Sequence, residues 1–138
     1  MTTVIKVKSG AKHESIASYS RLVALGDHLF VSNTGGRHPE TKEIAEDVTQ
    51  QSIQVIANIE RALRAVGSCL ADVIAIRVCV PNPADAESVG LVLGEKFRGI
   101  DPACTLTCSP LVSDVFKVEI DATAYRGASN YETEYLEI

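Results

Sequence analysis

Residues 101–109, Asp-Pro-Ala-Cys-Thr-Leu-Thr-Cys-Ser, could carry chemistry because they place two thiols close together. Asp101 and Pro102 open a turn. The alternation after them predicts a short strand with Cys104 and Cys108 on one face. Two thiols on one face either pack into a core or line a site. A thiol acts as a nucleophile only where a neighbouring cation or base lowers its pKa, so the surrounding elements must decide between the two.

Strands are predicted where polar and apolar residues alternate or β-branched residues gather. They cover residues 3–8, 19–25, 28–32, 73–80, 104–109 and 115–125. The pair Gly26 and Asp27 predicts a hairpin turn between the second and third strands. In the last strand, Glu119 falls on the face opposite to the core-facing positions.

Two helices are predicted from apolar residues that recur at steps of three and four. The first covers residues 48–66, with Asp47 as its N-cap and Gly67 as its C-cap. The second follows the N-cap Asn82 and begins at Pro83. The residues that it turns inward are Ala86, Val89, Leu93 and Phe97.

The resulting order, β-β-β-α-β-α-β-β, predicts an α+β fold with a single mixed β-sheet and two long helices packed on one face. The other face would be half exposed and would need cover from another subunit. Residues 1–126 are expected to form a single domain. Residues 127–138 are expected to be a polar tail draped on its surface.

Charge and composition exclude several classes of protein. The chain of 138 residues has a net charge of −5, and no cluster of Lys and Arg is present to bind the phosphates of a nucleic acid. No apolar run is long enough to cross a membrane, and the N-terminus lacks the pattern of a signal peptide. We therefore expect a cytoplasmic protein with neither a nucleic-acid nor a membrane partner.

The four cysteines form no C-x-x-C pair, and the three histidines do not lie near them in a zinc pattern. We therefore expect no metal. Free buried thiols are expected for all four cysteines.

Several motifs occur in an order that resembles the Rid/YjgF family, also called the L-PSP endoribonuclease-like family. Tyr19-Ser20 resembles the family's Gly-Pro-Tyr-Ser segment, and Ser32-Asn33-Thr34 its Ser-Gly-Gln segment. The other matching segments are His38-Pro39-Glu40-Thr41, Gln54-Val55-Ile56-Ala57-Asn58-Ile59, Ala71-Asp72-Val73, Pro102-Ala103 and Val118-Glu119-Ile120. The resemblance extends from about residue 3 to residue 125.

The resemblance implies a homotrimer with three ligand clefts at subunit interfaces and no cofactor. It also implies hydrolysis of reactive enamines and imines to keto acids and ammonia. In the family, an arginine after Pro-Ala clamps the substrate carboxylate, and a bound water attacks the imine carbon. A guanidinium suits that clamp because it binds a planar carboxylate through two parallel hydrogen bonds.

This chain departs from the family at three site positions. Cys104 stands at the arginine position, Gly90 near the position of an asparagine, and Leu93 at the position of an aromatic residue. Tyr19 and Glu119 remain. The smaller side chains predict a wider cleft and a bulkier or less anionic ligand.

Three interpretations of Cys104 remain open: a packing residue, a nucleophile, or a position opened for a different substrate. Glu119 is either a water-orienting carboxylate or a solvated one. Tyr19 either points its hydroxyl into the cleft or packs beneath the N-terminal loop.

A substrate-binding set is expected around these three catalytic candidates. Arg37 would replace the missing cation, with backbone N–H groups at Gly36 helping to hold an anion, unless Arg37 is an ordinary surface arginine. Ser32, Gly90 and Leu93 complete the set by the resemblance.

The sequence therefore predicts a metal-free, trimeric hydrolase of the deaminase type that acts on an enamine, imine or related C–N substrate in an intersubunit cleft. Turnover itself stays open. The alternative is a non-catalytic ligand-binding or regulatory trimer of the same fold. A ribonuclease is disfavoured by the acidic charge.

Overall fold

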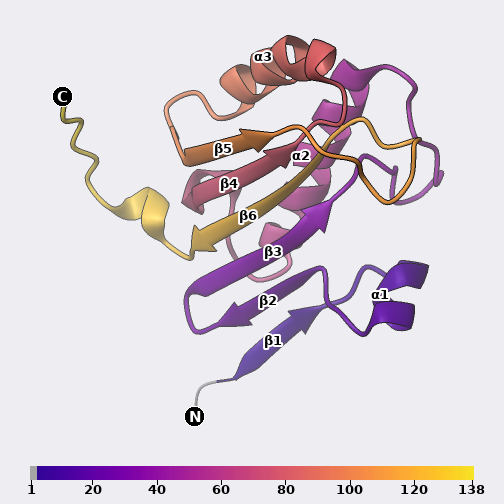
Figure 1. Ribbon diagram of the computed structural model, residues 1–138. Coiled ribbons are helices and arrows are strands. Elements are labelled where there is room, and N and C mark those ends of the chain that lie inside the picture. The colour runs from indigo at the N-terminus through magenta and orange to yellow at the C-terminus, as the bar shows by residue number, and fades with distance from the viewer. Residues whose placement is uncertain (1–2) are drawn as a thin grey trace.

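The computed structural model describes residues 3–138 as six strands in one sheet, in the order β1-β2-β3-β6-β4-β5 (Figure 1). The strands are β1 (Val4–Val7), β2 (Leu22–Leu25), β3 (His28–Thr34), β4 (Val73–Cys79), β5 (Ala103–Thr107) and β6 (Glu119–Tyr125). The β4–β5 pair is parallel and the other pairs are antiparallel. The sheet is therefore mixed, with β1 and β5 at its two edges.

Helix α2 (Val48–Arg64) forms because its apolar residues recur on one stripe and both of its ends are capped. The Asp47 carboxylate accepts from the Gln50 N–H at 2.9 Å. At the other end, Gly67 has φ +74°, and the Ser68 N–H donates to the Leu63 carbonyl at 3.0 Å. This is the left-handed glycine closure predicted for the helix.

Helix α3 (Ala86–Lys96) begins after a short 3-10 turn, Pro83–Asp85. The Asn82 side chain accepts from the Ala84 N–H at 3.1 Å, as predicted for its cap. Val89, Val92 and Phe97 are buried, whereas Leu93 is half-buried. The buried face is therefore rotated slightly from the predicted one, and it includes Val92.

Alternation along the strands separates a covered face from an open face of the sheet. The covered face is continuous with α2 and α3 in a single core. Its buried strand residues are Leu22, Ala24, Leu29, Val31, Thr34, Val73, Ile76, Val78, Ile120, Ala122 and Ala124. On the open face, Leu25 and Phe30 are each 50% exposed. The predicted α+β fold with both long helices on one face is confirmed.

Several local predictions differ from the structure. Residues 12–17 form a short helix, α1 (Lys12–Ala17), which is too short to show a helical period in the sequence. Strand β6 begins at Glu119 rather than at residue 115, because the Gln51 side chain on α2 binds the backbone of Val115 and Lys117. Strand β2 likewise begins at Leu22 rather than at residue 19.

The cysteine predictions are confirmed only in part. All four thiols are free, but Cys104 and Cys108 are exposed. Strand β5 is an edge strand whose residues are all exposed, and it ends before Cys108. The other two thiols, Cys69 and Cys79, are only half-buried. The expectation that all four thiols are buried is therefore wrong in the single chain.

Residues after Gly127 leave the sheet as an exposed tail, which Figure 1 shows extending away from the strands. The tail makes two hydrogen bonds with the domain. The Ser129 N–H donates to Asp72 at 2.9 Å, and the Tyr135 hydroxyl donates to Asp101 at 2.6 Å.

Candidate functional site

Glu119 lies at the start of β6 on the open face of the sheet, in register with Cys79 of β4. Its side chain is half-buried, and its Oε1 accepts a hydrogen bond of 2.8 Å from Asn33 Nδ2. Burial raises the pKa of Glu119, and the charge of Arg21 acts in the opposite direction. A carboxylate with a raised pKa and a fixed orientation can hold and activate a water molecule.

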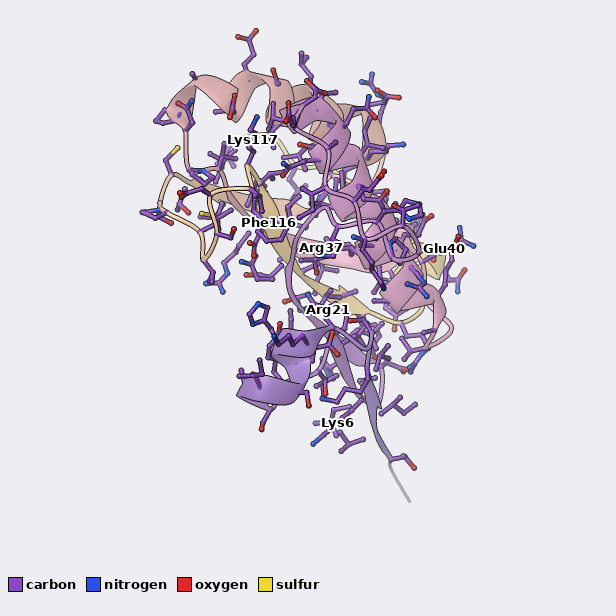
Figure 2. The ribbon with its side chains drawn as sticks, turned by 90° about the vertical axis from the view of Figure 1, so that its right-hand side faces the viewer. Lys6, Arg21, Arg37, Glu40, Phe116 and Lys117 are labelled. Carbon is purple, nitrogen blue, oxygen red and sulfur yellow. The ribbon has the colours of Figure 1, made fainter. Side chains whose placement is uncertain are left out.

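Tyr19 and Arg21 lie on the segment that leads into β2, and Arg21 is linked to this carboxylate through Asn33. The Arg21 guanidinium stacks 5.6 Å from the centre of the Tyr19 ring, and its Nη2 lies 3.5 Å from the Tyr19 hydroxyl oxygen. Figure 2 shows Arg21 on the side of the molecule where α1 lies, with Lys117 on the side of α3. The predicted tyrosine therefore contacts a cation that is not among the predicted site residues.

A β-bulge in β3 directs Asn33 toward Glu119 and Ser32 toward Ser20. The register of β3 against β6 shifts between Val31 and Thr34, and a bulge redirects the side chains of the bulged strand. Ser32 donates to the Ser20 carbonyl at 2.7 Å. The bulge therefore explains how Asn33 reaches across to Glu119.

Cys104 lies apart from this group. In β5 it is in register with Ile76, which is in turn in register with Ala122, and both of these are buried on the covered face. Glu119 and Cys104 thus lie on opposite faces of the sheet, with β4 between their strands. Burial raises the pKa of the Cys104 thiol, and no charged group within residues 3–138 opposes that rise. The described part of one chain therefore shows no cation or base that would lower the pKa of this thiol, as a thiolate nucleophile needs.

Gly90 and Leu93 belong to α3, on the same side of the sheet as Cys104. Leu93 packs against the core, and a Cβ placed on Gly90 would have no atom within 4 Å. Six of the eight predicted residues therefore divide into two groups, with Tyr19, Ser32 and Glu119 on the open side and Cys104, Gly90 and Leu93 on the helix side.

Arg37 and Gly36 build the loop after β3. A Cβ on Gly36 would lie 2.8 Å from the carbonyl oxygen of Gln51, so this position is closed by the α2 backbone. Arg37 Nη1 donates to the Lys42 carbonyl at 3.0 Å, and Arg37 forms an isolated bridge with Ile44. Arg37 also lines an open groove that includes Lys42, Asp114 and Lys117. In the single chain, Arg37 is bonded within its own loop.

Sequence reasoning missed Arg21 and Asn33. Arg21 was visible as a cation two residues after a candidate tyrosine. Asn33 lies just beyond the predicted strand 28–32, because a bulge leaves no mark in a pattern of alternation. Within residues 3–138, no group of three His, Cys, Asp or Glu side chains is placed to hold a metal ion. The described helices include none that is long and apolar enough to cross a membrane.

Comparison with known proteins gives consistent matches over nearly the whole chain. A RutC family protein of Pyrococcus horikoshii is 34% identical over 113 residues, which cover 80% of this chain and 89% of that protein. The chloroplastic Reactive Intermediate Deaminase A of Arabidopsis thaliana is 26% identical over 111 residues, which cover 80% of this chain and 59% of that protein.

Among solved structures, a YjgF/YER057c/UK114 family member from Mycobacterium tuberculosis superposes with a TM-score of 0.82 at 31% sequence identity. The superposition covers 89% of this chain and 99% of that one. The family profile described as endoribonuclease L-PSP matches residues 10–126. These matches support a Rid-type function in general terms, and the chain belongs to the endoribonuclease L-PSP family, also called the Rid/YjgF family.

Proposed function

We propose that this protein is a trimeric hydrolase of the deaminase type, which cleaves a small enamine, imine or related C–N substrate. Water adds to the carbon of the C=N bond, the C–N bond then breaks, and ammonia and a carbonyl compound leave. The observation that carries the proposal is the half-buried Glu119 carboxylate, oriented by Asn33 and opposed in charge by Arg21, in a chain of this family.

In this proposal, Glu119 orients the attacking water and accepts its proton. The Tyr19 hydroxyl lies beside Arg21 and donates to the nitrogen that leaves. Cys104 lines the opposite wall of the cleft, where its small side chain leaves room and offers no positive charge. The protein should therefore accept neutral C–N substrates at least as well as carboxylated ones.

The division of the predicted residues between two faces supports a cleft built from two chains. Glu119 and Cys104 cannot face one substrate from within one sheet, because β4 separates their strands and their side chains point to opposite faces. The half-exposed Leu25 and Phe30 on the open face favour burial against another copy. A homotrimer with a composite cleft at each interface meets both requirements.

The direct test is ammonia release from freshly generated 2-aminoacrylate and from its neutral amide. Glu119→Gln should lower kcat by about 100-fold or more, because it removes the general base. Asp121→Asn is the matched control, since Asp121 lies on the same face but is paired with Arg77. It should stay close to the native rate.

Two outcomes would contradict the proposal. One is release of ammonia no faster than in buffer with either substrate. The other is equal activity of the Glu119→Gln and native proteins. Binding of the amide without turnover would favour the ligand-binding alternative.

A further inference from the structure

We infer that Arg21 is a positioning residue of this site, which fixes the Glu119 carboxylate through Asn33 and supplies the positive charge that faces it. The inference rests on the proposed function for the role given to Glu119. The contacts of Arg21 carry it independently of any substrate.

Arg21 is built into the structure rather than placed on the surface. Its side chain is 14% exposed, and its Nε lies 3.6 Å from the carboxylate of Glu14, whose side chain is 3% exposed. Glu14 is held in turn by the backbone N–H of Ser9 at 3.0 Å and by the Ser9 hydroxyl. These contacts fix the orientation of the Arg21 guanidinium. A buried charged group is stable only where its N–H donors are paired with acceptors.

The other end of the guanidinium faces the bulge of β3. Arg21 Nη1 donates to the Asn33 carbonyl at 2.7 Å and to Thr34 Oγ1 at 3.1 Å. These two bonds hold the bulged backbone, and the Asn33 side chain continues from it to Glu119 at 2.8 Å. Arg21 therefore reaches the carboxylate through one intervening residue.

Of the charged groups near Glu119, Arg21 is the cation that lowers its pKa, because the other nearby cations are bound to other partners. On the open face, Arg77 is held by Asp121 at 3.1 Å. Two residues before Glu119, Lys117 donates through Nζ to the Glu46 carbonyl. From β4 the register partner is Cys79, whose thiol lies 3.1 Å from the Ser109 hydroxyl. Burial raises the pKa of Glu119, and Arg21 opposes that rise.

The inference is tested by following the carboxyl titration of Glu119 by ¹³C NMR of glutamate-labelled protein without substrate. The Glu119 signal is assigned as the one lost in Glu119→Gln. The variants are Arg21→Met, which removes the charge, and Arg21→Lys, which keeps the charge but lacks the planar guanidinium with its several N–H donors. Arg77→Met is the matched control, because it removes a cation from the same face.

In Arg21→Met, the Glu119 midpoint should move to higher pH, because the charge that favours the ionised form is gone. Arg77→Met should leave the midpoint at its native value, and Arg21→Lys should give a midpoint between the two. The side-chain amide signals of Asn33 should shift in both Arg21 variants, because the bulge loses its two donors. Where turnover is measurable, the acid limb of kcat/KM should move with the midpoint.

An unchanged Glu119 midpoint in folded Arg21→Met would overturn the inference, and so would an equal shift in Arg77→Met. If Arg21→Met does not fold, Arg21→Lys serves as the test. Native Asn33 amide signals together with a native Glu119 midpoint in Arg21→Lys would also refute the inference. Because the titration needs no substrate, a protein that shows these shifts but releases no ammonia would refute the proposed function alone.

Discussion

Gly36 shows how closely the loop after β3 packs on α2. A Cβ at this position would lie 2.8 Å from the backbone oxygen of Gln51, which is fixed within the helix and cannot move aside. We expect Gly36→Ala to lower the free energy of unfolding by about 1–3 kcal/mol, the usual cost of overpacking. Urea denaturation at one fixed protein concentration measures this change.

The matched control is Gly94→Ala, on the exposed side of α3, where a Cβ meets no atom within 4 Å. Alanine should raise stability there by roughly 0.5–1 kcal/mol, because glycine is the poorer helix former. A Gly36→Ala protein as stable as the native one would mean that the loop does not rest on the α2 backbone.

At the same scale, the sequence indicates which residue types could form a site, but it predicts less well toward which face of the sheet their side chains point. Glu119 was correctly placed opposite Val118 and Ile120, because alternation in β6 is regular. The site roles of Tyr19 and Cys104 stay predictions. Asn33 could not be selected, since its direction depends on a bulge that forms only when β3 pairs with β6.

At the scale of elements, both long helices and the hairpin could be predicted because local signals agreed with one another. Asp47, Gly67 and the apolar stripe all indicate the same α2, and Gly26 has the positive φ of its turn. Helix α1 could not be predicted, because its stability depends on the contact of Glu14 with Ser9 and Arg21. Tertiary contacts of this kind leave no local period in a sequence.

One element-scale contact, the tail on the domain, has a pH dependence that can be worked out. Burial raises the pKa of Asp72, but hydrogen bonds from Ser68 and Ser129 outweigh burial and lower the pKa from 3.8 to about 2. Because the folded pKa lies below the unfolded one, ionised Asp72 stabilises the protein above about pH 3.8. This contribution, about 2 kcal/mol, is lost as the pH falls toward 2.

Urea unfolding between pH 5 and pH 2.5 measures this loss. Asp72→Asn should be less stable at pH 5 and should lose less stability on acidification than the native protein. Asp114→Asn, which removes an exposed carboxylate, should retain the native slope. Parallel curves for Asp72→Asn and the native protein would show that the tail contact does not depend on this carboxylate.

At the scale of the whole molecule, the two groups of candidate residues lie on opposite faces of the sheet of one chain. The open face carries Glu119, and the helix side carries Cys104. If each cleft is formed by the open face of one chain and the helix side of another, two variants that are inactive for different reasons should complement one another in mixed trimers. We therefore expect activity from mixed trimers of Glu119→Gln and Cys104→Trp, in which the indole fills the opposite wall.

Equal co-expression of these two inactive chains leaves about one quarter of the clefts with both halves intact, if subunits assemble at random in closed trimers. Ammonia release should therefore recover to about one quarter of the native rate per trimer. A mixture of Glu119→Gln with the double variant contains no intact cleft and should stay inactive. Were the first mixture no more active than its parents, one chain would have to supply both halves. That result would be inconsistent with the opposite directions of Glu119 and Cys104 in the sheet, because no single face carries both side chains.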